Sequence, residues 1–201
     1  MLRVMVVILI MFMILFIVPV SAAPKDVTNS IKDKKKIVSL TKEFLQPAAV
    51  NLVGGVGMKS PIKAGKSRTF QFSKNADRRT ILKFPRTGGV VKYDKNGRFT
   101  KRSLQKLSKQ IFGKNTSKIV QNVVGDWGDQ YPVLRNVKIY RASKVKYVVK
   151  ADIYFHEILD TGGFQEEKEG TLSLKISRKN GAKCGYVATA LTVKKKGWRV
   201  T

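Results

Sequence analysis

Apolar and polar residues alternate along the last third of the chain. Between residues 145 and 159 the odd-numbered positions are largely apolar, and residues 172–176 continue the same two-residue period. Shorter runs of this kind cover residues 136–140 and 186–193. Alternation over these lengths predicts antiparallel strands that bury one face against a core.

Three earlier segments show the period of an amphipathic helix instead. Residues 25–46 form the first, and Pro47 marks its expected end. The second covers residues 100–113, where a Thr and a Gly occupy the positions expected of the two caps. A third helix is predicted to begin at Asn115 or Thr116 and to continue towards residue 127.

Short strands are predicted between these helices. Residues 69–73 and 80–84 fit this pattern, and residues 88–99 read as a hairpin whose Asn96-Gly97 pair suits a type I′ turn. The whole arrangement predicts an α+β fold, with helices packed on one face of a curved antiparallel sheet.

The N-terminus carries a targeting signal. Residues 4–20 form 17 uncharged positions after Arg3, and Ser21 and Ala22 are small. This pattern predicts a secretory signal peptide that is cleaved after Ala22. An uncleaved N-terminal membrane anchor is the alternative, because 17 residues lie at the short end of what a spanning helix needs. Both place the remainder in the extracellular space or the cell envelope.

The chain divides into three parts on this basis. Residues 1–22 are the signal peptide or anchor. Residues 23–68 form a basic helical arm with a Gly- and Lys-rich loop, and residues 69–201 form the α+β domain.

The order of elements in the C-terminal half resembles the nuclear-transport-factor-two-like superfamily. Helices are followed by long antiparallel strands that end in Lys195-Lys196-Gly197-Trp198-Arg199-Val200, and the resemblance covers roughly residues 100–201. It implies a cone-shaped α+β fold. That superfamily hosts enzymes, binding modules and inert domains, so the resemblance implies no particular activity.

Composition excludes several kinds of site. The 201 residues include one Cys and one His, so an intrachain disulfide framework is impossible and a structural zinc site is not expected. We predict no metal and no cofactor.

One strand offers the residue types of acid–base chemistry. His156, Asp152 and Tyr154 would point to the same face of a strand. Such a set suits general acid–base catalysis, and it equally suits a polar face exposed to solvent. The solvent-exposed interpretation is favoured, so the protein is more consistent with a binding protein than with an enzyme.

Charge is the strongest functional signal. The chain has 40 Lys and Arg against 13 Asp and Glu, a formal charge of +27. Between residues 44 and 125 there are 18 Lys and Arg but only two acids, Asp77 and Asp94. Solubility alone needs a net charge of only about 2–8. Aromatic residues are interleaved with these cations, and their spacing favours a core position over base stacking.

The sequence therefore predicts an exported basic protein that binds an anionic cell-surface polymer or membrane headgroups. A small-molecule-binding or catalytic domain with a cavity near His156 is the alternative, and extracellular nucleic-acid binding is a further one. The residues predicted to bind the polyanion are Lys59, Lys63, Lys66, Arg68, Arg78, Arg79, Arg86, Arg98, Lys101 and Arg102.

Overall fold

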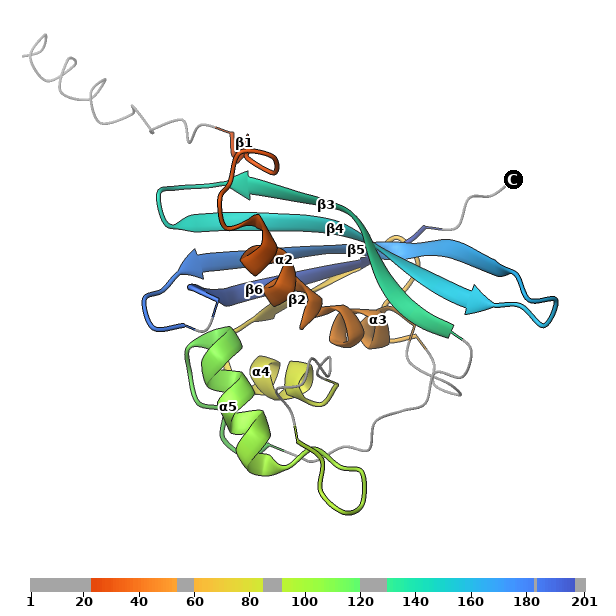
Figure 1. Ribbon diagram of the computed structural model, residues 1–201, viewed down its shortest axis with the longest axis horizontal. Coiled ribbons are helices and arrows are strands. Elements are labelled where there is room, and N and C mark those ends of the chain that lie inside the picture. The colour runs from red at the N-terminus through yellow and green to blue at the C-terminus, as the bar shows by residue number, and fades with distance from the viewer. Residues whose placement is uncertain (1–22, 54–59, 85–91, 120–129, 183, 198–201) are drawn as a thin grey trace, which may run out of the picture.

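The computed structural model of the chain describes residues 23–53, 60–84, 92–119, 130–182 and 184–197. The predicted signal peptide or anchor lies outside them. Within these described residues, six antiparallel strands form one sheet and four helices accompany it, so the α+β prediction is confirmed (Figure 1). Across the sheet the strands are β1 (Lys25–Asp26), β3 (Gln130–Arg141), β4 (Lys146–Ile158), β5 (Phe164–Arg178), β6 (Tyr186–Lys195) and β2 (Ser67–Gln71). The helices are α2 (Lys34–Lys42), α3 (Leu45–Val53), α4 (Asn75–Leu82) and α5 (Lys101–Phe112).

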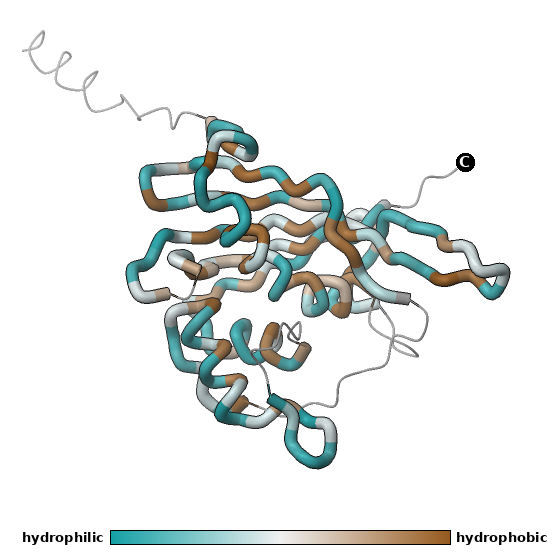
Figure 2. The backbone as a smooth tube through the Cα atoms, in the orientation of Figure 1, coloured by the Kyte–Doolittle hydropathy of each residue, from teal (hydrophilic) through white to brown (hydrophobic). Residues whose placement is uncertain are grey.

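The strands β3 to β6 form the meander that the alternation predicts. Apolar and polar residues alternate along their backbone (Figure 2). In β4 the odd-numbered side chains face the core, and their exposed fractions do not exceed 9%. These are Tyr147, Val149, Ala151, Ile153 and Phe155.

The helices α2 and α3 cover the apolar face of this sheet (Figure 1). Phe44, in the short link between them, is fully buried. Its ring centroid lies 5.5 Å from that of Phe72 and 6.0 Å from that of Phe112. This aromatic trio joins the N-terminal helices to the end of β2 and to α5, so residues 25–53 share one hydrophobic core with the strands.

The prediction of one helix over residues 25–46 is wrong. Lys25 and Asp26 form β1, the helix α2 begins only at Lys34 and ends at Lys42, and α3 begins at Leu45. Pro47 therefore lies in the first turn of α3 rather than at a helix end. Proline is tolerated there because the first-turn N–H groups have no partner within the helix.

The strand predicted at residues 80–84 is also wrong, because α4 reaches Leu82. Arg78, Ile81 and Leu82 are its buried residues, and their spacing of three and four is helical. A segment of five residues fits a period of two as well as one of 3.6, so periodicity alone does not distinguish a strand from a helix here.

The turn at Asn96-Gly97 is not type I′. A type I′ turn needs a positive φ at both central residues. Gly97 has a positive φ of 69°, but the φ of Asn96 is not positive. The backbone N–H of Asp94 donates to Arg98 O, and that of Gly97 donates to Asp94 O, which indicates a three-residue loop. Tyr93 and Phe99 form the bridge that closes it.

Of the two helices predicted after residue 99, α5 is confirmed. The Thr100 hydroxyl accepts a hydrogen bond from Ser103 N, and Gly113 ends the helix in the left-handed conformation. The expected start of the next helix at Asn115 or Thr116 is wrong, because residues 115–119 are not helical. The rest of that prediction falls on residues outside the described part of the chain.

Among the described residues, only β1 pairs with the outer edge of β3. β1 pairs with it at Lys25↔Arg141 and Asp26↔Tyr140, and the β3–β4 register shifts between Arg135 and Lys138. Pro132 lies in the part of β3 beyond β1.

A close approach at Gly170 fixes how α3 sits on the sheet. A Cβ atom at this position would lie 2.3 Å from Lys194 O and 2.9 Å from Leu52 Cδ2. We expect Gly170→Ala to lower the free energy of unfolding by at least about 2 kcal/mol in a urea titration, because a backbone atom must move. The matched control is Gly163→Ala, whose Cβ would meet nothing closer than 4.0 Å. Equal stability of the two variants would contradict the close packing.

Candidate functional site

Cations gather on the helices α4 and α5 and the loops beside them. We call the described residues 74–84 and 92–118 the basic lobe. The helices contact each other, and they contact β2 and β6 respectively (Figure 1). The lobe contains 13 Lys and Arg and two acids. Ten of these cations are exposed: Lys74, Lys92, Lys95, Arg98, Lys101, Arg102, Lys106, Lys109, Lys114 and Lys118.

Both acids of the lobe bind backbone rather than cationic side chains. Asp77 Oδ2 accepts a hydrogen bond of 2.7 Å from Gln71 N. Asp94 Oδ1 accepts bonds from the backbone N–H groups of Asn96 and Arg98, both of 2.9 Å. The six ion pairs found within the described residues all lie outside the lobe. The positive charge of this surface therefore remains uncompensated.

Arg78 differs from the other predicted cations because it is only 7% exposed. Its guanidinium donates to Phe72 O at 2.7 Å, to Ser73 O at 3.0 Å and to Asn115 O at 3.1 Å. It also donates to the Thr116 hydroxyl at 3.2 Å. Arg78 thus ties the end of β2 to the segment after α5. Since its donors are already used, we exclude it from the binding surface.

The remaining predicted cations occupy varied positions. Arg98, Lys101 and Arg102 are exposed in the lobe, whereas Arg79 is half-buried there. Lys63, Lys66 and Arg68 are exposed beside β2, and the Arg68 guanidinium carbon lies 4.7 Å from the centroid of the Phe70 ring. Lys59 and Arg86 lie outside the described residues. Of the interleaved rings, Phe70, Phe72 and Phe99 are buried, as the spacing predicted, whereas Phe84 is half-buried and Tyr93 is exposed.

His156 does pair with a carboxylate, but the residue is Glu166. Their side chains share a contact of 3.1 Å between Nδ1 and Oε1. Arg135 donates to the same carboxylate through Nε, at 3.1 Å, and through a second guanidinium nitrogen. The His156 ring stacks between Tyr131 and Phe164, with centroid distances of 4.7 and 4.6 Å. A ring held in this way has a fixed orientation, which a proton-transfer group requires.

Asp152 and Tyr154 do not complete this cluster. Asp152 accepts from Lys168 Nζ at 2.8 Å and from Asn136 Nδ2 at 2.9 Å. Burial raises the pKa of the Asp152 carboxyl, but these two donors outweigh burial and leave the pKa below its usual value. Tyr154 lies on the same face, opposite Lys168 and Val133.

Sequence analysis missed Glu166 and Arg135 because strand register decides their positions. The β4–β5 register sets Glu166 opposite His156, and the β3–β4 register sets Tyr131 on the other side. A bulge in β5 beside Ile153 changes which residues of that strand share a face with β4. Glu166 lies between the β4–β5 turn and this bulge, so its position follows from locating the turn alone. Arg135 lies beyond the bulge of β3 as counted from the β3–β4 turn, so a plain count from that turn gives it the wrong partner.

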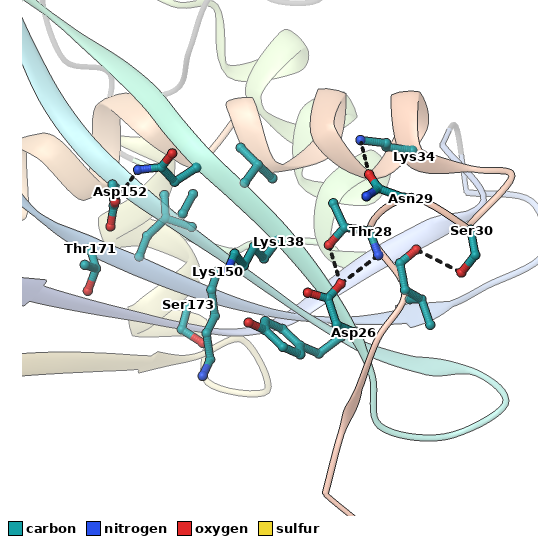
Figure 3. A pocket seen from close by; sticks show the side chains of 16 residues that line it. Asp26, Thr28, Asn29, Ser30, Lys34, Lys138, Lys150, Asp152, Thr171 and Ser173 are labelled. Carbon is teal, nitrogen blue, oxygen red and sulfur yellow. Dashed lines mark hydrogen bonds between the residues drawn. The ribbon is translucent and has the colours of Figure 1, made fainter.

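A hollow of about 1080 Å³ lies beside Asp152 (Figure 3). The segment 26–34 borders it on one side, and side chains of β3, β4 and β5 border it on the other. Asp152 lines this hollow and His156 does not, so the predicted set of His156, Asp152 and Tyr154 does not share one cavity.

Other kinds of site find no support in the described part of the chain. There, no three His, Cys, Asp or Glu side chains come together as a metal site would need. None of the helices there has the length and apolar content to cross a membrane. Comparisons of the chain with protein-family models, curated proteins and solved structures find no match.

We expect Arg78→Met to lower the free energy of unfolding by about 3 kcal/mol or more, because three carbonyl groups lose a charged donor. Denaturant unfolding measures this loss. Arg79→Met is the matched control on the same helix, since Arg79 Nε is buried without a hydrogen-bond partner. Its expected change is below about 1 kcal/mol. An equal loss in both variants would show that Arg78 is not the structural tie.

The Glu166 carboxylate predicts a pH dependence. Hydrogen bonds from Arg135, and then from His156, hold its pKa below the usual value. Its ionised form therefore stabilises the fold above the unfolded pKa of about 4.3, and this stabilisation is lost as the pH falls through the lowered folded value. We expect Glu166→Gln to be less stable than wild type near pH ~7, with a difference that shrinks in acid. Urea titrations across this range test it, with Glu169→Gln as control. A difference that stays constant in acid would contradict this account.

Proposed function

We propose that the protein binds a linear anionic polymer through the basic lobe. The observation that carries the proposal is that ten exposed cations of the lobe have no carboxylate partner within the described residues, while its two acids are committed to backbone. Mutual repulsion of these cations opposes folding, so the fold gains nothing from gathering them. A polyanion would compensate them and release its counterions.

The composition of the lobe favours binding by charge density. Nine of its 13 cations are Lys, which acts as a hydrated point charge rather than as a planar bidentate donor. Binding of this kind depends strongly on salt and tolerates many polymers. Tyr93 is the exposed large apolar residue among the described positions of the lobe, so the surface offers little to insert into a bilayer.

The proposed cellular location follows from the N-terminal segment. The N-terminal segment 1–22 would export the protein or hold it at a membrane, and the polymer would be an anionic component of the cell surface. Phosphate- and sulfate-bearing polymers share the required chemistry.

A charge-matched pair of variants tests the proposal. Arg102, Lys106 and Lys109 are exposed on one face of α5, at spacings of four and three residues. Replacing all three by Gln should weaken binding to heparin and to polyphosphate by roughly tenfold to a hundredfold at low salt. The slope of log affinity against log salt should fall by roughly two. Fluorescence titration at several salt concentrations measures both quantities.

The control removes three exposed cations outside the lobe, in Lys144→Gln/Lys146→Gln/Lys175→Gln. We expect it to retain most of the wild-type affinity. An equal loss in both triple variants would contradict binding at the lobe. Retention on heparin no stronger than that of a neutral protein of this size would contradict polyanion binding altogether. Tighter binding to anionic vesicles than to either polymer would favour membrane headgroups instead.

A further inference from the structure

Two lysines face each other across β3 and β4 beside the large hollow. Lys138 and Lys150 are direct cross-strand partners, and both line the hollow (Figure 3). Like charges in directly opposed positions destabilise a sheet. This arrangement therefore costs stability in the free protein, and nothing in the packing of the core requires it.

The carboxylates of the hollow form no ion pair with either lysine among the described residues, although the charge of Lys138 adds to the hydrogen bonds from Thr28 in lowering the pKa of the Asp26 carboxyl. Asp26 accepts hydrogen bonds from Thr28 N at 2.9 Å and from the Thr28 hydroxyl at 2.6 Å. Asp152 is bound by Lys168 and Asn136. Neither Lys138 nor Lys150 belongs to an ion pair within the described residues, although the Lys150 ammonium lies 5.2 Å from the centroid of the Tyr140 ring.

Hydroxyl groups extend the same surface. Ser173 is the partner of Lys150 on its other side, and Thr171 is the partner of Asp152. Both are half-buried and both line the hollow. Tyr140 adds a ring at its wall. Two ammonium groups beside hydroxyls and one aromatic ring suit a ligand that carries an acidic group on a polyhydroxylated frame.

We propose that this hollow binds a compact acidic sugar unit, with its phosphate or carboxylate bridging Lys138 and Lys150 and its hydroxyls facing Ser173 and Thr171. The volume of about 1080 Å³ lies just above the usual range of about 300–1,000 Å³ for small-ligand sites, which leaves room for one or two such units. The site is separate from the basic lobe and does not depend on polymer binding there.

Isothermal titration with glucose 6-phosphate, glucuronate and glucose tests the proposal and separates the two acidic groups. We expect saturable binding of at least one acidic sugar and much weaker binding of glucose. Lys138→Gln and Lys150→Gln should each raise the dissociation constant at least about tenfold, because each removes one of the two charges that hold the acidic group. Lys175→Gln is the matched control, since Lys175 is an exposed strand residue that does not line the hollow.

A second measurement does not need the right sugar. In chloride buffer, Lys150→Gln should melt up to about 3 °C higher than wild type, because the repulsion is relieved and no carboxylate loses a cationic partner. Inorganic phosphate at equal ionic strength should stabilise wild type and Lys175→Gln more than either hollow variant.

The results that overturn the site are specific. Equal stabilisation of wild type and of both hollow variants by phosphate would show that phosphate acts elsewhere. Equal binding of glucose and the acidic sugars would contradict the proposal that Lys138 and Lys150 hold the acidic group. The Arg102→Gln/Lys106→Gln/Lys109→Gln variant should keep the sugar response, and the hollow variants should keep heparin binding, so failure of one site is distinguishable from failure of the other.

Discussion

The constraint on which the structure depends is the need to cover one apolar face of a four-stranded meander. The strands β4, β5 and β6 each present alternate apolar side chains to the same side, and water must be excluded from that side. The helices α2 and α3 cover it, and the rings of Phe44, Phe72 and Phe112 join this cover to β2 and α5. Because the interior is filled in this way, the polar chemistry of the protein lies on the outside of the sheet and on the lobe.

This division also explains how charge is distributed. Carboxylates gather on the hairpin of β4 and β5, where Glu166, Glu167 and Asp152 each bind a cation. The lobe has only two acids, and both hold the backbone in place, one at the start of α4 and one at the loop before α5. Both carboxylates of the lobe are therefore hydrogen-bonded to the backbone, and its excess of cationic side chains faces the solvent.

Periodicity predicted the long strands and α5 because a dozen residues distinguish a period of two from one of 3.6. It failed at α4, where the segment was too short to distinguish the two periods. The prediction also failed at Pro47, because proline is compatible with the first turn of a helix as well as with a position after its end. The face shared by His156, Asp152 and Tyr154 follows from alternation alone. Their partners do not. Glu166 requires the position of the β4–β5 turn, and Arg135 and Tyr131 lie beyond the bulge of β3, which no local sequence rule locates. The burial of Arg78 could not be predicted either, because it depends on contacts with a segment that is distant in the sequence.

The edge of β3, which the described residues pair only at β1, has a consequence for how the protein behaves when it is concentrated. Open strand edges template pairing between molecules and lead to fibrils. Along β3, Pro132 cannot donate a backbone hydrogen bond, and the bulge between Arg135 and Lys138 bends the edge out of line. With the surplus of positive charge, these features keep neighbouring molecules from adding to the sheet and so resist aggregation in a crowded environment.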